Sequence, residues 1–342
     1  MNARLKILRQ VLTRKWFTDQ RTPLEMVSGD LTGKTVVITG SNRGVGFEAA
    51  KHFAGMNVGR LILACRSIKG GNLAAQDICA STGCGSVECW LLDLGSFASV
   101  QSFATRIEEE NIRVDIFIGN AATMSSKLST TEDEWETMLQ VNYLSNVLLT
   151  ILLLPHMSPR KNEFQPRIIL MSSEAHYFIQ HLKEADGPEM LSKLNDPQHC
   201  SVSVMEQRYF VSKLFVLFFS RELAHRVNSE TSPIIVSVTP GLCSSDLDIE
   251  STNSQTMRYL KRVVMSFISR TPEMGSRTII HAAINPEGPT QHGRYLANCR
   301  IEVESNYSLS TEGMLVQHRL WDETMHILQS IEPRVEKILQ AL

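Results

Sequence analysis

The sequence lacks the features that mark membrane-spanning and nucleic-acid-binding proteins. Its longest strongly apolar stretch, Val147 to Leu154, is far shorter than the roughly 18 residues that cross a bilayer. The 34 basic and 36 acidic residues leave a formal net charge of −2, so no overall basic field attracts nucleic acid. We therefore expect no transmembrane helix and no nucleic-acid partner.

Cysteine and histidine pairs at metal-binding spacing are also missing. Among the seven cysteines, Cys79, Cys84 and Cys89 are five residues apart, unlike the two-residue spacing of zinc knuckles and redox pairs. We expect no metal, and reduced, mostly buried thiols in an intracellular, cytoplasmic protein. The histidines in predicted loops are interpreted as loop or pocket-rim residues, with His176 a candidate substrate neighbour: His156, His176, His181 and His199.

The composition is that of an ordinary globular protein, with 43% apolar and 20% charged residues in 342. The first 30 residues form a basic amphipathic leader, in which Met1 to Arg21 holds one acid, Asp19. Apolar residues recur there at helical spacing, namely Leu5, Leu8, Leu12 and Trp16. Such a helix either makes peripheral contact with an anionic membrane through residues 1–21 or packs on the edge of the main domain.

Short apolar runs then alternate with helix-period segments, which is typical of a parallel sheet covered on both faces. We expect six strands: Thr35–Thr39, Arg60–Cys65, Val87–Leu92, Val114–Gly119, Arg167–Met171 and Ile234–Thr239. The expected helices include Gly46–Ala54, Phe97–Glu110, Glu132–Leu154 and Tyr209–Val227. The pattern predicts a single doubly wound, Rossmann-type α/β/α domain over residues 31–300, followed by a helical extension over 301–342.

A glycine-rich turn joins the first strand to the first helix of this domain. Glycines there let the chain turn tightly and let backbone N–H groups approach a pyrophosphate at the helix N-terminus. The turn therefore predicts a dinucleotide site, with Gly40, Ser41, Asn42, Arg43, Gly44, Val45 and Gly46 as cofactor contacts.

The end of the second strand indicates which dinucleotide binds. NAD sites usually place an acid there to bond the ribose 2′-OH, whereas this chain has Cys65-Arg66. Arg66 and Arg43 could clamp a 2′-phosphate through charge-assisted hydrogen bonds. We predict NADP(H) as the cofactor; the alternative is that Arg66 is a solvated residue at a strand end.

These residues resemble the short-chain dehydrogenase/reductase family from about Thr32 to Tyr295. Thr39 to Gly46 reads TGxxxGxG, and Asp93-Leu94 resembles the pair that contacts the adenine ring. Asn120-Ala121-Ala122 stands where the family commonly has Asn-Ala-Gly, which makes Asn120 and Ala121 further cofactor contacts. The segments 270–273 and 293–295 look most like the retinol-dehydrogenase and WW-domain-oxidoreductase-like branch, to which many fungal biosynthetic reductases are similar.

The resemblance also implies the catalytic residues. Val141-Asn142 matches the catalytic asparagine, Ser172-Ser173 ends with the substrate-binding serine, and Tyr209 to Lys213 reads YxxxK. Asn142 would position a water of the proton relay, and Ser173 would hold the substrate oxygen. The loop over the nicotinamide is implied by Pro240, Gly241 and Ser245.

The spacing of Tyr209 and Lys213 has a physical reason. Residues four apart share one face of a helix, so the lysine can lie beneath the tyrosine. An ammonium next to a phenol favours the phenolate, which makes Tyr209 a usable acid and base near neutral pH. Lys213 would also bond the nicotinamide ribose.

Two insertions beside the chemistry, residues 174–208 and 247–270, carry apolar side chains that would form a lid or pocket walls. Such walls favour a lipophilic ketone, aldehyde or alcohol of terpenoid, steroid, retinoid or polyketide type. The sequence thus predicts an NADP(H)-dependent oxidoreductase for such a substrate, a step suited to secondary-metabolite biosynthesis. The alternatives are a non-catalytic dinucleotide-binding scaffold or sensor, and a nucleotide-sugar enzyme with a larger C-terminal domain.

Overall fold

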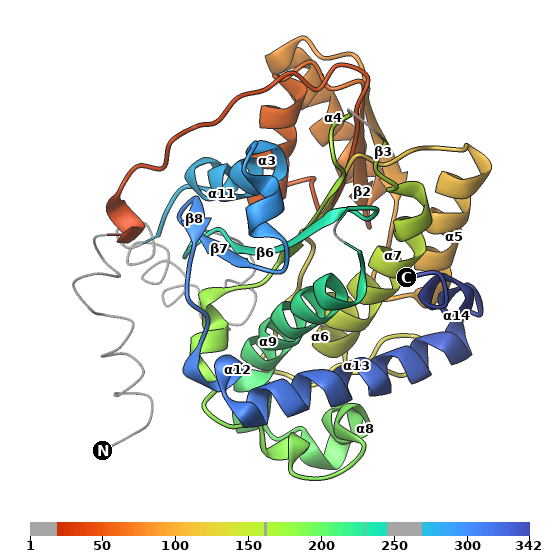
Figure 1. Cartoon of the computed structure of the whole chain (residues 1–342), viewed down its shortest axis with the longest axis vertical. Helices are drawn as coiled ribbons and strands as arrows, with labels where there is room; N and C mark the ends of the chain where they lie inside the picture. The colour runs from red at the N-terminus through yellow and green to blue at the C-terminus, as the bar shows by residue number, and fades with distance from the viewer. Residues whose placement is uncertain (1–18, 161–162, 229, 245–268) are drawn as a thin grey trace.

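The computed structural model describes residues 19–160, 163–228, 230–244 and 269–342 (Figure 1). Ser245, residues 1–18 of the leader and most of the insertion 247–270 lie outside the described residues. The expectations for them therefore stay predictions.

One sheet forms the centre of the fold, with strand order β3-β2-β1-β4-β5-β6-β7-β8. All neighbouring strands are parallel except β7 and β8. The predicted doubly wound α/β fold is confirmed, and the two strands at one edge were not expected. The strands are β1 (Thr35–Thr39), β2 (Arg60–Cys65), β3 (Val87–Leu91), β4 (Ile116–Gly119), β5 (Arg167–Met171), β6 (Ile234–Thr239), β7 (Tyr295–Ala297) and β8 (Arg300–Ile301).

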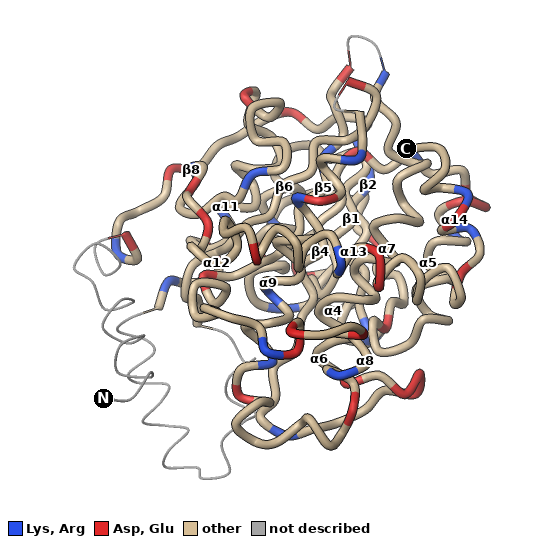
Figure 2. Tube along the Cα trace, turned by 60° about the horizontal axis from the view of Figure 1, so that its bottom comes forward, with Lys and Arg blue, Asp and Glu red and all other residues tan. Residues whose placement is uncertain are grey.

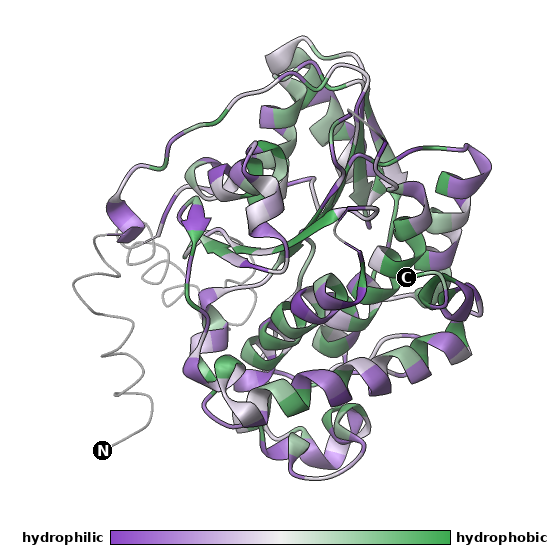
Figure 3. Cartoon of the chain, viewed as in Figure 1, coloured by the Kyte–Doolittle hydropathy of each residue, from purple (hydrophilic) through white to green (hydrophobic). Residues whose placement is uncertain are grey.

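Helices cover both faces of this sheet because its strands alternate between two apolar cores. Val36 and Ile38 face one core, whereas Val37 faces the other. The central strands, such as β6, are accordingly largely hydrophobic in Figure 3. The first core is covered by α3 (Gly44–Ala54), α4 (Ile68–Thr82) and α11 (Pro272–Ile284), and the second by α5 (Phe97–Glu109), α7 (Ser145–Leu153) and α9 (Val202–Arg226).

The C-terminal extension adds an outer layer on α7 and α9 (Figure 1). Trp321 stacks on Phe219 with ring centres 5.9 Å apart, and the Tyr143 hydroxyl lies 2.8 Å from Thr324 Oγ1. The extension is therefore part of the main core. Its helices are α12 (Asn306–Leu309), α13 (Thr311–Ile331) and α14 (Arg334–Leu339).

The insertion 174–208 folds into short elements, including the 3-10 turn Glu174–Phe178 and α8 (Met190–Asn195). The expectation that its apolar residues line a pocket is wrong for most of them. They pack inside the core because α13 covers them, and each is at most 5% exposed: Ile179, Leu182, Met190, Leu191 and Leu194.

Two helix boundaries also differ from the expectation. The helix predicted over Glu132–Leu154 begins with α6 (Thr137–Leu139), because Glu134 has a left-handed φ of 62° and residue 136 bridges back to residue 130. The helix predicted to begin at Tyr209 already begins at Val202. Tyr209 therefore lies inside a continuous helix.

One helical stretch, Thr137–His156, is long and apolar enough to cross a membrane by length and composition alone. Of its apolar window, 89% is buried inside the fold, so the stretch acts as a core helix.

In Figure 2, basic and acidic residues are interspersed over the described part of the chain.

Residues 19–24 pack against the main domain although they belong to the predicted leader. Leu24 is buried, and its backbone N–H lies 3.2 Å from Met274 Sδ on α11. The side chain of Arg270 donates to the carbonyl oxygens of Asp19 and Gln20. The packed domain therefore begins well before residue 31.

Candidate active site

The carboxyl ends of the parallel strands bring the predicted site residues to one edge of the sheet. The strand order reverses between β1 and β4, and ligands of doubly wound folds bind at such a point. The glycine turn follows β1, and Asn120 follows β4. Ser173 follows β5 and Pro240 follows β6.

The glycine turn has a backbone path and a close packing that residues with side chains would prevent. Gly40 and Gly44 both have φ of +64°, which other residues rarely adopt. A Cβ on Gly46 would lie 2.4 Å from Asn120 Nδ2 and 2.9 Å from the Gly40 oxygen. Glycine at 46 thus lets α3 begin tightly packed against Asn120 and the turn, and backbone N–H groups at such a helix N-terminus favour an anion.

Two polar side chains predicted as cofactor contacts instead hold the turn in place. Asn120 Nδ2 donates to the carbonyl oxygens of Thr39 at 2.8 Å and Gly40 at 3.1 Å. Ser41 is fully buried, and its hydroxyl donates to the Ile38 oxygen at 2.9 Å. A cofactor would therefore meet the backbone at Ser41. Ala122 has no positive φ, so alanine is tolerated where the family commonly has glycine.

The end of β2 presents positive charge and no acid. Arg43 and Arg66 are exposed, and Arg66 forms no ion pair within the described part of the chain. Burial raises the pKa of the neighbouring Cys65 thiol, which keeps that position uncharged.

The predicted adenine contacts follow β3. Asp93 accepts a hydrogen bond from the Gly95 N–H at 2.8 Å, and Leu94 is 5% exposed.

Lys213 lies under the predicted catalytic tyrosine on α9. Its Nζ is 5.7 Å from the centre of the Tyr209 ring and donates to the Met171 oxygen at 2.7 Å. Burial lowers the pKa of Lys213 to about 8. The ring of Tyr209 is half-buried against Met138, Cys200 and Met205. The buried ammonium and the phenol therefore share one face of α9.

The two serines after β5 have different roles. Ser172 is buried and its hydroxyl donates to the Lys213 oxygen at 2.9 Å, so it supports α9. Ser173 is half-buried, and its hydroxyl oxygen accepts the Ala175 N–H at 3.1 Å. Because that bond uses the oxygen, the hydroxyl proton of Ser173 remains available for a substrate oxygen.

Asn142 lies in a π-helical turn, Gln140–Leu144, between α6 and α7. Such turns often occur at functional sites. Its Oδ1 accepts the Thr123 N–H at 2.7 Å, and its Nδ2 donates to the Thr123 oxygen at 2.9 Å and to Ser212 Oγ at 3.0 Å. These bonds occupy both amide hydrogens, so the side chain of Asn142 joins three segments of the site.

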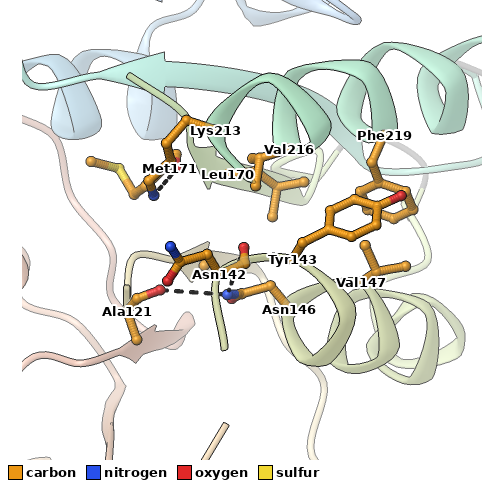
Figure 4. A pocket seen from close by; sticks show the side chains of 11 residues that line it. Ala121, Asn142, Tyr143, Asn146, Val147, Leu170, Met171, Lys213, Val216 and Phe219 are labelled. Atoms are coloured by element: carbon orange, nitrogen blue, oxygen red, sulfur yellow. Dashed lines mark hydrogen bonds between the residues drawn. The ribbon is translucent and has the colours of Figure 1, made fainter. Parts of the chain in front are cut away.

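A cavity of about 10 Å³ lies between Lys213 on one side and Asn142 and Asn146 on the other (Figure 4). Asn146 Nδ2 donates to the Val141 oxygen at 2.8 Å, and its buried Oδ1 has no hydrogen-bond partner among the residues that the structure describes. The cavity has room for one water, which Lys213 and Asn146 Oδ1 could hold. Sequence reasoning missed Asn146, although its spacing of four from Asn142 placed it on the same helix face.

The loop after β6 meets the N-terminal segment. Gly241 has a φ of +75°, and a Cβ there would lie 2.4 Å from Gln20 Oε1. Gln20 Nε2 donates to the Leu242 oxygen at 3.0 Å. Sequence reasoning missed this contact because 222 residues separate the two partners.

His176 is fully buried rather than at a pocket rim, because the Tyr177 ring is tilted over its ring and the Tyr295 ring packs against it edge-on. No group of three or more metal-binding side chains lies together in the ranges that the structure describes.

Comparisons with known proteins agree with this arrangement. Residues 34–180 match the short chain dehydrogenase family model. The chain is 35% identical to the short chain dehydrogenase/reductase dmxR8 of Cryptosporiopsis sp. (strain 8999) over 314 residues, which cover 90% of this chain and 94% of that protein.

Solved structures share the fold at low identity. A short-chain dehydrogenase from Sphingobium yanoikuyae in complex with NADPH has a TM-score of 0.53 at 20% identity, and the match covers 73% of this chain and 84% of that one. A 3-ketoacyl-(acyl-carrier-protein) reductase from Brucella melitensis complexed with NADH has a TM-score of 0.55 at 19% identity, with 78% and 97% covered. With its glycine turn, its tyrosine and lysine four residues apart on α9, and its relatives, this chain belongs to the short-chain dehydrogenase/reductase family of nicotinamide-dependent oxidoreductases.

Proposed function

We propose that this enzyme transfers a hydride between NADP(H) and a lipophilic ketone, aldehyde or alcohol, with Tyr209 as the general acid and base. The observation that carries the proposal is the buried Lys213 ammonium beneath Tyr209, next to the glycine turn. A dinucleotide-binding scaffold or sensor would need the glycine turn but no buried charge beneath a phenol. The cost of burying that ammonium therefore favours catalysis over a scaffold.

The chain's own residues can manage the proton and the oxygen. When bound, NADPH supplies the hydride that reaches the carbonyl carbon. The Tyr209 hydroxyl donates its proton to the carbonyl oxygen, and the Ser173 hydroxyl donates a hydrogen bond to the same oxygen. The Lys213 ammonium stabilises the phenolate that remains on Tyr209. In the oxidation direction, the same phenolate removes the alcohol proton.

The cavity behind Lys213 could hold a water that helps to orient the ammonium beneath Tyr209. The Lys213 ammonium has three N–H groups, and Met171 accepts one of them. A water in the cavity could accept a second and donate to Asn146 Oδ1. The Asn142 side chain, whose amide hydrogens are both used, would hold the walls of this cavity rather than the water itself.

The substrate class rests on two aromatic side chains, one of which, Phe210, has its ring centre 6.4 Å from that of Tyr209. Phe178 ends the 3-10 turn that begins after Ser173, and Phe210 follows Tyr209. The two rings are 5.1 Å apart and both are only half-buried. An apolar surface next to Ser173 and Tyr209 favours a lipophilic substrate of terpenoid, steroid or polyketide type.

The preference for NADP(H) rests on Arg66 and Arg43. Changing Arg66→Asp should weaken NADPH binding by several-fold or more, because a hydrogen bond to a charged group is worth roughly 1.5–3 kcal/mol. The affinity for NADH should stay the same or rise, because NADH has no 2′-phosphate and an acid at this position can bond its ribose 2′-OH, so a fall limited to NADPH separates lost recognition from misfolding. Fluorescence titration of both cofactors measures the two affinities. Unchanged NADPH affinity in this variant would remove Arg66 from the site.

A further inference from the structure

We propose that His176 is a positioning residue that connects the catalytic-serine turn to the C-terminal extension, so that residues 303–305 take part in forming the active site. The inference rests on the proposed function, because Ser173 has its role only in that reaction. His176 makes no contact with a substrate in this account. It acts through Ser173.

Two hydrogen bonds fix the orientation and the tautomer of the His176 ring. Nδ1 lies 2.6 Å from the Ser173 oxygen, and Nε2 lies 3.2 Å from the backbone nitrogen of Ser305. The Ser305 N–H can only donate, so Nε2 accepts and Nδ1 carries the hydrogen that Ser173 accepts. One neutral imidazole thus satisfies a carbonyl of the catalytic turn and an N–H of the extension.

The surroundings of His176 keep the ring neutral and in place. The side chain is 0% exposed, with the Tyr177 ring centre at 4.2 Å and the Tyr295 ring centre at 4.8 Å. Burial lowers the pKa of His176 to about 4. Both hydrogen bonds therefore persist at neutral pH.

Three consecutive residues of the extension are held by the two elements that carry the catalytic hydroxyls. The Tyr177 hydroxyl, from the turn after Ser173, donates to the Val303 oxygen. Glu304 pairs with Arg221 of α9 at 2.6 Å. The Ser305 N–H donates to Nε2 of His176. The segment 303–305 therefore spans from the serine turn to the tyrosine helix.

The backbone of Ser173 depends directly on this connection. Its carbonyl oxygen accepts both the His176 backbone N–H at 3.2 Å and the ring Nδ1–H at 2.6 Å. Its side-chain oxygen is held within the same turn by the Ala175 N–H. Removing the imidazole takes away one of the two hydrogen bonds to the Ser173 carbonyl oxygen, so the peptide that orients the Ser173 hydroxyl is held less firmly. A misplacement of about 1 Å can cost on the order of 100-fold in rate.

Two pairs of variants separate positioning from packing. His176→Phe keeps an aromatic ring and removes both hydrogen bonds, whereas His176→Asn keeps a donor near the Nδ1 position. Ser305→Pro removes the N–H at a residue whose φ of −62° already suits proline, and Ser305→Ala shows how much the loss of the Ser305 side-chain cap contributes. We expect His176→Phe to lower kcat roughly 10- to 100-fold with unchanged NADPH affinity. His176→Asn should recover much of that loss, and Ser305→Pro should fall well below Ser305→Ala.

The deciding measurement repeats His176→Phe in a Ser173→Ala background. If His176 acts through Ser173, the second change should lower kcat by no more than about two-fold there. A full additional loss in that background, or equal activity of Ser305→Pro and Ser305→Ala, would show that His176 only packs the core. If Ser173→Ala alone has no effect, the proposed function fails at the serine, which is a separate outcome.

Discussion

Tyr209→Phe should lower turnover by at least roughly 100- to 10,000-fold, the usual contribution of general acid–base catalysis. The change removes one oxygen and leaves the ring packed against Met138, Cys200 and Met205. Folding and NADPH affinity should therefore stay close to those of the unchanged protein. Single-turnover NADPH oxidation with a lipophilic carbonyl measures the chemical step, and cofactor titration measures binding.

Tyr307→Phe is the matched control for this experiment. Tyr307 is buried on α12, a helix that carries none of the predicted site residues. Losing that hydroxyl should leave turnover unchanged. Near-normal turnover of Tyr209→Phe with an active substrate would leave this chain a dinucleotide-binding fold without the proposed chemistry.

Lys213→Met should lose both turnover and cofactor affinity, and it should change how the stability of the protein depends on pH. The ammonium has two roles in the proposed reaction, since it stabilises the phenolate and binds the nicotinamide ribose. Its burial, however, lowers its pKa from 10.5 to about 8, so the charged form opposes folding. Methionine removes this cost but also leaves the Met171 oxygen without its donor, a loss of about 1–3 kcal/mol, so the ammonium is identified by the pH dependence of the stability difference rather than by its sign at pH 7.

The pH dependence tests this account of Lys213. Between pH 8 and 10.5 the unfolded chain binds more protons at this residue than the folded one, so the unchanged protein gains stability as the pH rises. The free energy of unfolding of Lys213→Met, relative to that of the unchanged protein, should therefore be highest below pH 8 and should fall towards pH 10.5. Lys337→Met, at an exposed position on α14, is the control. A difference in stability between Lys213→Met and the unchanged protein that stays constant from pH 7 to 10.5 would contradict the account.

Combining the two changes gives a further check within the same series. Tyr209→Phe and Lys213→Met should be non-additive in turnover, because a lysine that tunes a missing hydroxyl has less left to contribute.

The sheet could be predicted because its strands carry their own signal. Five-residue apolar runs such as Thr35–Thr39 and Arg167–Met171 are buried on both faces, and the structure has them at the predicted residues. The glycine turn was readable for a similar reason, since it directly follows one of these strands. The edge strands β7 and β8 have three and two residues, too few for periodicity to show.

The environment of the site could not be predicted, because it depends on partners far apart in the chain. Nothing local to His176 indicates that residue 305 will meet it across 129 positions. Likewise, the apolar residues of the insertion 174–208 looked like pocket walls because α13, which covers them, lies more than 100 residues later. The π-helical turn at Asn142 has no sequence period of its own, since it replaces one turn of an otherwise ordinary helix.

The start of the packed domain could not be predicted either, because it also depends on partners far apart in the chain. Gly29 to Gly33 reads as the end of a leader, yet Gln20 and Leu24 are buried against the main domain. Arg270 supplies the reason, because its guanidinium needs the carbonyl oxygens of residues 19 and 20. A truncation meant to retain activity should therefore begin at residue 19 rather than at residue 30.

The most direct test follows the hydride itself. The enzyme should be given NADPH carrying deuterium at the transferable position of the nicotinamide, together with a panel of lipophilic ketones and aldehydes, and the products analysed by mass spectrometry. The account predicts an alcohol with one deuterium on the carbinol carbon, formed by the unchanged protein and reduced at least roughly 100-fold in Tyr209→Phe. Deuterated alcohol formed at equal rates by both proteins would contradict the role of Tyr209, and NADPH binding without deuterium transfer to any carbonyl would contradict the proposed reaction.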